Sequence, residues 1–394
     1  MASLTRAFGA SRLDLAEEVV QDTLLKALKV WPYQGIPERP EAWLYRVARN
    51  RALDLLRRER HMEMPVDSST LAALATVPGP EDSSDDELAL VFLCCHPALS
   101  VDAQVALTLR TVGGLSIHEI AAAFLTSRAT VQQRIVRAKR TLAEGRLDPL
   151  LPEGPVLVHR RHGVLAVLYL MFNEGYAATE GDALVRFELC GEAIRLARLV
   201  ATHPHVGGPD ASALLALLLF QASRLSARTG GDGALILLED QDRRRWDRGL
   251  MAEGFHWLEA ATESPQVTRY HLEAGIASGH AAAGSWADTD WPRILDLYDL
   301  LQQLSPSPVV EVNRAVAVAL ARSPMEGLAA LEGVDAPPGY YLLPATRGHL
   351  LALAGQRENA SVEYRRALMA CRNASVRAHL RRRIDALEGG AQRG

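Results

Sequence analysis

Residues 115–142 constrain the fold more than any other part of the chain, because they encode two helices joined by a short turn. The segment reads LSIHEIAAAFLTSRATVQQRIVRAKRTL. Ser116 and Glu119 have the spacing of a capping box that starts the first helix. Residues 125–127 (LTS) supply the turn, where a serine or threonine can cap the second helix. The segment therefore predicts a helix-turn-helix.

The second of these helices has an apolar face and a polar, cationic face. Val131, Ile135, Ala138 and Leu142 recur at helical spacing and should face inward. The side chains left for contact with DNA are Arg128, Thr130, Gln132, Gln133, Arg134, Arg137, Lys139 and Arg140. Gln and Arg at the front of a recognition helix can bond the edges of A and G, whereas later cations suit phosphates. A helical hairpin with a solvated charged face is the alternative.

Residues 43–60 (WLYRVARNRALDLLRRER) predict a second basic helix of a different kind. Aromatic side chains lie at its start, beside the irregular loop of residues 32–42, and arginines follow along its length. Aromatics combined with cations can stack on unpaired bases and follow a single strand. The candidates for this role are Trp43, Tyr45, Arg46, Arg49, Asn50, Arg57 and Arg58. A core-anchoring role is the alternative for Trp43.

Charge is strongly segregated along the chain, although the net charge is only −4. Residues 1–60 carry 11 Lys/Arg against 8 Asp/Glu, residues 61–109 carry none against 8, and residues 110–146 carry 7 against 2. Local charge makes the electrostatic footprint, so a near-neutral average does not argue against nucleic acid. Residues 61–86 are rich in Pro, Ser and Asp and predict an acidic linker.

The N-terminal helix is predicted from AEEVVQDTLLKAL at residues 16–28, where Val20, Leu24 and Leu28 recur four residues apart. Its acids lie near the first turn and its lysines near the last, which suits the helix dipole. We expect Trp31-Pro32 to end this helix, and Glu41 or Ala42 to begin the next.

A 33-residue period runs through the C-terminal part of the chain. The recurring positions are Ile294, Gly327 and Ala360; Tyr298, Leu331 and Tyr364; Leu301, Val334 and Ala367; and Ala282, Ala315 and Gly348. This order of small and large residues is the helix-pair packing code of tetratricopeptide-like repeats. Chance alignment in a region rich in Ala and Leu is the alternative.

Strand alternation is nearly absent, so the sequence predicts an all-α protein. Apolar runs such as 214–220 are too short to span a bilayer, and the N-terminus lacks the apolar core of a signal peptide. The cysteines at 94, 95, 190 and 371 form no CxxC, which favours reduced thiols and a cytoplasmic protein. The histidines are too isolated to indicate a metal site, and no nucleotide-binding or nucleophile-elbow motif occurs. We therefore expect no enzyme activity, metal or cofactor.

Taken together, these segments resemble a bacterial RNA polymerase sigma factor of the extracytoplasmic-function class. AEEVVQDTLLKALKVW is similar to region 2.2, which docks on the clamp helices of the polymerase β′ subunit. EAWLYRVARNRALDLLRR resembles regions 2.3–2.4, which melt and read the −10 element. Residues 87–146 resemble region 4, which reads the −35 element and meets the β flap, with GGLSIHEIAAAF and TVQQRIVRAKR as its reading element.

The resemblance implies roles for individual residues. By position, Gln21, Asp22 and Lys26 fall on an exposed face of the core-binding helix. Gln132, Gln133, Arg134 and Arg137 fall on −35-reading positions. The implied partners are core polymerase and promoter DNA, with no membrane. Few residues precede Leu15, so the first helix of sigma domain 2 should be short.

The remaining chain resembles the large extension of one subgroup of these sigma factors, in stretches such as GVLAVLYLMFNEGYAA and SPSPVVEVNRAVAVAL. The expected domains are residues 1–60, the linker 61–86, residues 87–146, and a regulatory repeat domain at 156–394. That last domain is expected to meet a protein or peptide partner and to act in cis, with inhibition and activation both open.

A helix-turn-helix regulator with a sensing repeat domain is the second hypothesis, and an enzyme fused to a DNA-binding domain is a third. Residues 16–60 discriminate between the first two, because an ordinary regulator needs neither a polymerase-docking helix nor a melting helix.

Overall fold

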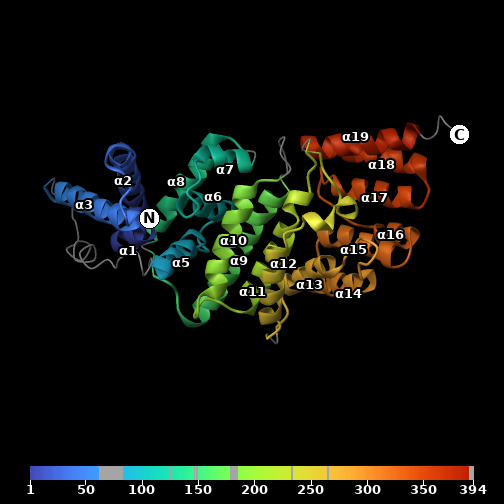
Figure 1. The fold of residues 1–394 in the computed structure, drawn as a ribbon, viewed down its shortest axis with the longest axis horizontal. Coiled ribbons are helices and arrows are strands. Elements are labelled where there is room, and N and C mark those ends of the chain that lie inside the picture. Colours follow the sequence, from blue (N-terminus) through green and yellow to red (C-terminus); the bar gives the residue numbers. More distant parts are fainter. Residues whose placement is uncertain are drawn as a thin grey trace. The chain divides into compact units, whose positions relative to one another are not determined.

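The computed structural model describes residues 1–61, 83–124, 126–145, 147, 150–177, 185–231, 234–263 and 266–389, which are largely helical (Figure 1). The β pairing within these residues is one isolated bridge between Thr229 and Leu235, so the predicted all-α class is confirmed. No helix in this described part is long and apolar enough to cross a membrane. The chain divides into two compact units, residues 1–170 and residues 171–394.

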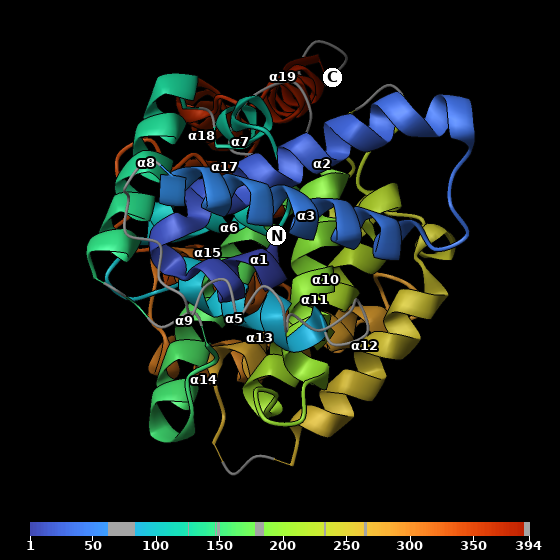
Figure 2. The same ribbon diagram turned by 90° about the vertical axis from the view of Figure 1, so that its left-hand side faces the viewer.

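The first unit begins with α1 (Ala2–Phe8), the turn η1 (Ala10–Arg12), α2 (Leu13–Gln34) and α3 (Pro40–His61). The first helix is short, as expected. Figure 2 shows α2 and α3 side by side, and their core includes Val19, Leu56 and the α1 residues Leu4 and Phe8.

The prediction that Trp31-Pro32 ends α2 is wrong, because the helix continues through Pro32 to Gln34. A proline in the last turn removes only one backbone hydrogen bond. The helix stops instead at Gly35, whose φ of 81° is left-handed and whose N–H donates to the Trp31 carbonyl at 2.9 Å.

The rest of the first unit consists of α5 (Ser83–Cys94), α6 (Val101–Thr111), α7 (Ile117–Ala123), α8 (Arg128–Glu144) and the start of α9 (Gly154–Tyr176). Residues 62–82 of the predicted linker lie outside the described residues, and its last four residues form the first turn of α5. Helix α9 is continuous across the division between the two units.

Arg160 of α9 supports the end of α5. Its guanidinium donates to the Phe92 carbonyl and lies 5.9 Å from the centroid of the Phe92 ring. The last carbonyls of a helix have no partner within the helix, so a basic side chain at this end supplies one.

The second unit opens with α10 (Phe187–Thr202), α11 (Pro209–Ser223) and α12 (Arg248–Ala261). Helix α11 lies at the centre: residues 210–220 are all buried, and α10, α12 and α13 (Arg269–Ala282) pack around it. A helix that is apolar all round is the kind that a core encloses.

Helix pairs follow in succession. They are α13 with α14 (Trp291–Leu304), α15 (Pro308–Ala321) with α16 (Pro324–Ala330), and α17 (Leu342–Leu353) with α18 (Arg357–Ala370), before the final α19 (Ala374–Gly389). Serines cap α15 and α16, each followed by a proline at the first helical position. Ile294, Gly327 and Ala360 are buried where the 33-residue period puts them, although Ala282 is exposed. The predicted stack of helix pairs is confirmed.

Helices α15 and α16 approach closely at Gly327. A Cβ atom on this residue would lie 2.5 Å from the Ala319 Cβ and 2.8 Å from the Ala315 carbonyl oxygen. Neither atom is the end of a flexible side chain, so neither can swing away. Only glycine fits at this position in the α15–α16 pair.

We expect Gly327→Ala to lower the free energy of unfolding by about 1–3 kcal/mol, because the added methyl overpacks two backbones. Gly191→Ala on α10 is the matched control, since no heavy atom lies within 4 Å of its added Cβ. Better helix propensity should make that control neutral or stabilising, by up to about 1 kcal/mol. Chemical denaturation measures both, and equal stabilities for the two variants would contradict the close approach.

Candidate nucleic-acid interface

Both helix starts predicted within residues 115–142 are confirmed. The Ser116 N–H donates to Glu119 Oε2 at 2.7 Å, and the Glu119 N–H donates to Ser116 Oγ at 3.1 Å. These hydrogen bonds hold the pKa of Glu119 below its usual value. Ser127 Oγ accepts from the Thr130 N–H at 3.0 Å and starts α8, while residue 125 of the turn lies outside the described residues.

Helix α8 has the two faces that the sequence predicts. Val131, Ile135, Ala138 and Leu142 are buried. The exposed side chains are those of Arg128, Gln132, Gln133, Arg137 and Arg140. They leave hydrogen-bonding and cationic groups facing solvent, as contact with base edges and phosphates requires.

Three of the exposed or predicted positions also have partners in the protein. Arg128 Nη2 lies 3.1 Å from His118 Nδ1, and the Thr130 hydroxyl shares a 2.8 Å hydrogen bond with that of Ser127. Arg134 forms a 3.0 Å ion pair with Asp102 of α6. Such surface pairs are weak, so they can open when a phosphate arrives.

Lys139 departs from the prediction that it faces outward, because its side chain is only 11% exposed. Its ammonium lies 2.6 Å from Asp14 and 2.8 Å from Glu17, both at the start of α2. Burial acts to lower the pKa of Lys139, but the hydrogen bonds and charges of these two carboxylates raise it above its usual value. The recognition helix is therefore tied to the N-terminal helices in this arrangement.

Helix α3 carries the second set of candidates. Arg46, Asn50, Arg57 and Arg58 are exposed, while Tyr45 and Arg49 are half-buried. Burial is the main reason that the pKa of Tyr45 is raised.

The anchoring alternative for Trp43 has geometric support. The Trp43 ring lies 5.5 Å from that of Trp31, tilted by 59°, and so helps to hold α2 against α3. Its side chain is only partly buried.

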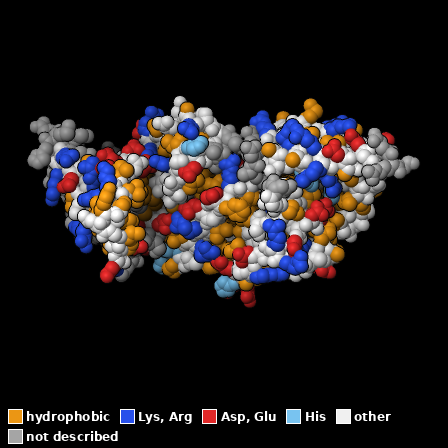
Figure 3. Space-filling view, turned by 45° about the horizontal axis from the view of Figure 1, so that its top comes forward, with side chains coloured by type: hydrophobic (Ala, Val, Ile, Leu, Met, Phe, Trp, Pro, Cys, Tyr) orange, Lys and Arg blue, Asp and Glu red, His pale blue; other side chains and the backbone are white. Residues whose placement is uncertain are grey.

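Helix α2 presents its large apolar residues to solvent. Ala16, Val19, Thr23 and Ala27 form its buried face, whereas Leu24, Leu25 and Leu28 are 50%, 53% and 72% exposed. Leu24, Leu25 and Leu28 therefore form an outer stripe on α2, and its smaller residues form the core face. Hydrophobic side chains lie among basic ones on the surface of α2 and α3 (left in Figure 3).

Two of the three core-binding candidates on α2 are exposed, namely Gln21 and Lys26. Asp22 keeps 37% of its side chain exposed, but its Oδ2 also accepts a 2.6 Å hydrogen bond from Arg51 Nε of α3. Sequence reasoning missed Arg51. In the structure it faces the acids of α2, and its guanidinium also lies 3.6 Å from Glu18.

Among the residues that the structure describes, the thiols and acids form no evident chemical centre. All four cysteines are buried and unpaired, and burial raises the pKa of Cys95 to about 12. Within the described ranges, no group of three His, Cys, Asp or Glu residues could hold a metal ion.

Comparison with known families assigns most of the first unit. Sigma-70 region 2 matches residues 2–62, and sigma-70 region 4 matches residues 89–142. A family of unknown function, DUF6596, matches residues 160–262. No solved structure matches the chain.

Individual relatives fall into two groups. An uncharacterised protein of Rhizobium meliloti, R00370, is 40% identical over 395 residues, which cover 98% of this chain and 93% of that protein. The ECF RNA polymerase sigma-E factors of Escherichia coli K12 and Salmonella typhi are each 29% identical over 143 residues, or 34% of this chain and 74% of theirs. The chain thus belongs to a family of sigma factors of the extracytoplasmic-function type that carry a large helical C-terminal extension.

Proposed function

We propose that this protein binds core RNA polymerase and directs it to a specific set of promoters, and that it works in the cytoplasm, where both partners are found. One observation carries the proposal: a capped helix-turn-helix and the α2–α3 pair, with its exposed apolar stripe, occur in one chain. A simple helix-turn-helix regulator would need the first of these features but not the second.

The proposed core-binding surface is the outer side of α2. Leu24, Leu25 and Leu28 provide an apolar centre, with Gln21 and Lys26 beside it. An apolar centre with a polar rim is the usual anatomy of a protein interface. We assign this surface to the β′ clamp helices, and residues 87–146 to the β flap.

The proposed promoter contacts divide between two helices. On α8, Gln132, Gln133 and Arg137 would read bases, while Arg128 and Arg140 would hold phosphates. On α3, the exposed arginines would follow the backbone of the melted strand, with Trp43 and Tyr45 near its bases. Lys139 could join the phosphate contacts only after it leaves Asp14 and Glu17.

Alanine replacements should separate base reading from backbone tracking. Gln132→Ala and Arg137→Ala should each cost about 1–3 kcal/mol on the preferred −35 sequence and relax the preference. Arg57→Ala and Arg58→Ala should weaken binding on every sequence and flatten its salt dependence. Holoenzyme binding to a promoter panel at several salt concentrations measures this, and one uniform loss for all four variants would refute the division.

Run-off transcription tests the proposal as a whole. Purified core polymerase, this protein and a promoter library should yield transcripts that depend on the protein and start at a shared sequence. Specific DNA binding without polymerase, combined with no transcript, would favour the helix-turn-helix regulator instead.

We further propose that the C-terminal extension regulates the sigma portion in cis. Helix α9 supports this proposal, because it contributes to both units and Arg160 within it caps α5. A conformational change in the extension could therefore reach the DNA-reading unit through α9, which is continuous with the extension and contacts α5 through Arg160.

A further inference from the structure

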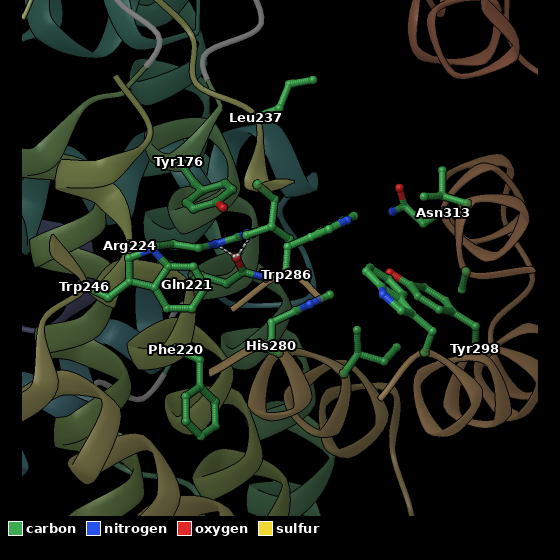
Figure 4. A pocket seen from close by; sticks show the side chains of 16 residues that line it. Tyr176, Phe220, Gln221, Arg224, Leu237, Trp246, His280, Trp286, Tyr298 and Asn313 are labelled. Atoms are coloured by element: carbon green, nitrogen blue, oxygen red, sulfur yellow. Dashed lines mark hydrogen bonds between the residues drawn. The ribbon is translucent and has the colours of Figure 1, made fainter. Parts of the chain in front are cut away.

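The second unit contains a cavity of about 490 Å³ between α11, α13, α14 and α15. Figure 4 shows Tyr176 and Arg224 on one side of it, Tyr298 and Asn313 on the other, and His280 and Trp286 between them. Cavities of this size hold drug-sized ligands, and they are usually apolar with a few polar groups that converge. No part of the sigma function described above uses this cavity.

One side of the cavity is cationic. Arg224 donates to the neutral Gln221 side chain, from Nε at 3.1 Å and from Nη2 at 2.5 Å. It forms no ion pair with any residue that the structure describes, and no Asp or Glu lines the cavity. Enclosure by protein lowers the pKa of Arg224, which records the cost of removing this cation from water.

Two further arginines lie beside it. The Arg228 guanidinium sits 3.6 Å from the centroid of the Tyr176 ring, and that of Arg224 lies 5.4 Å from the same centroid. Arg243 lies 5.1 Å from the Trp246 ring and donates to the backbone carbonyls of His280 and Ala283. Of the three arginines only Arg224 lines the cavity, and a cation in a partly enclosed site without a lining carboxylate is stabilised by an incoming anion.

Buried polar atoms in the same wall lack partners. His280 Nδ1 and Trp246 Nε1 are buried and form no hydrogen bond with any described residue. Burial, assisted by Arg224 and Arg243, lowers the pKa of His280 to about 3, so this imidazole is neutral at physiological pH. Buried polar groups are rarely left unsatisfied, and here a ligand would supply the missing partners.

The aromatic residues of the cavity favour a ligand that also has an apolar part. Trp286 and Trp291 lie 4.6 Å apart at 65°, and His280 lies 5.3 Å from Trp291. Tyr298 adds a further ring to the lining. Aromatic faces of this kind favour a flat, apolar partner.

We propose that this cavity binds a small organic anion with a flat apolar body, of the aromatic carboxylate class. Arg224 receives the carboxylate, His280 and Trp246 offer further polar atoms, and Trp286 and Trp291 hold the ring. The extension would thereby sense a metabolite. A peptide is disfavoured because the polar groups converge on one site between helices and do not extend along a groove.

Titration of the full-length protein tests the proposal without polymerase or promoter, so its outcome is separate from that of the proposed function. The probes are benzoate, salicylate and indole-3-acetate, each compared with its neutral amide, with tryptophan fluorescence and calorimetry as readouts. At least one acid should bind, and its amide should bind roughly tenfold or more weakly, because the charge-assisted hydrogen bond is lost. Arg224→Gln should lower the affinity for the acid by roughly ten- to a hundredfold.

Arg293→Gln is the matched control, since Arg293 is an exposed arginine of α14 that does not line the cavity. It should bind like the wild type. Failure of all three acids, equal binding of acids and amides, or full affinity in Arg224→Gln would each overturn the proposal. Binding confined to peptides with a free C-terminal carboxylate would also overturn it. If Arg224→Gln does not fold, the comparison of acid with amide on the wild type still decides.

Discussion

Replacing Leu24 and Leu28 together by glutamate should abolish binding to core polymerase while the protein stays folded. Both side chains are at least half exposed in the free protein, at 50% and 72%, so their loss costs little in folding. At the centre of an interface the same change removes apolar contact and buries two charges, which typically costs more than about 2 kcal/mol for each central residue. Fluorescence anisotropy with labelled protein and purified core measures the affinity.

The chain offers a closely matched control for this experiment. Leu300 and Leu304 on α14 are also four residues apart, and each is 50% exposed. Glutamate at both positions should leave core affinity unchanged. Undiminished binding by the Leu24/Leu28 variant would remove α2 from the interface. Asp22→Arg is a poorer probe, because it places an arginine against Arg51 and disturbs the α2–α3 pair itself.

Deleting residues 156–394 should cost the protein most of its transcription activity for a structural reason. The deletion removes Arg160 and leaves the Phe92 carbonyl at the end of α5 without this partner. Loss of a hydrogen bond from a charged donor costs about 1.5–3 kcal/mol, and the lost packing of α9 adds to it. Thermal unfolding should show a lower midpoint than for a chain that ends at residue 177 and keeps α9.

The truncated chain that ends at residue 177 keeps α9 and therefore tests the regulatory role of the rest of the extension by itself. It should keep core binding, and its run-off activity should differ from that of the full chain, higher for an inhibitory extension and lower for an activating one. Equal activity and equal core affinity would refute regulation in cis. Arg160→Gln in the full chain is the companion variant, since it removes the α5 contact but retains the extension.

Much of the fold could be predicted because local signals agree with tertiary packing. The Ser116–Glu119 box and the apolar positions of α8 were readable, since a cap and a helical period depend on neighbours in sequence. The 33-residue period was readable for the same reason, because each repeat packs on the next.

What could not be predicted depends on residues distant in sequence. The outward position of Leu24 and Leu28 follows from which face of α2 meets α3, and an apolar period cannot distinguish a core from an interface. Lys139 looked like another phosphate contact because Asp14 and Glu17 lie 125 and 122 positions earlier. The lining of the cavity around Arg224 includes side chains from five helices, α9, α11, α13, α14 and α15, so no local sequence pattern predicts it.

The contact between Arg160 and α5 has a consequence for synthesis on the ribosome. A nascent chain that has extended to residue 145 contains every residue of the helix-turn-helix, yet the end of α5 still lacks its partner. That partner arrives only with α9, the first helix of the extension. The DNA-reading unit therefore gains this contact only after translation has entered the extension.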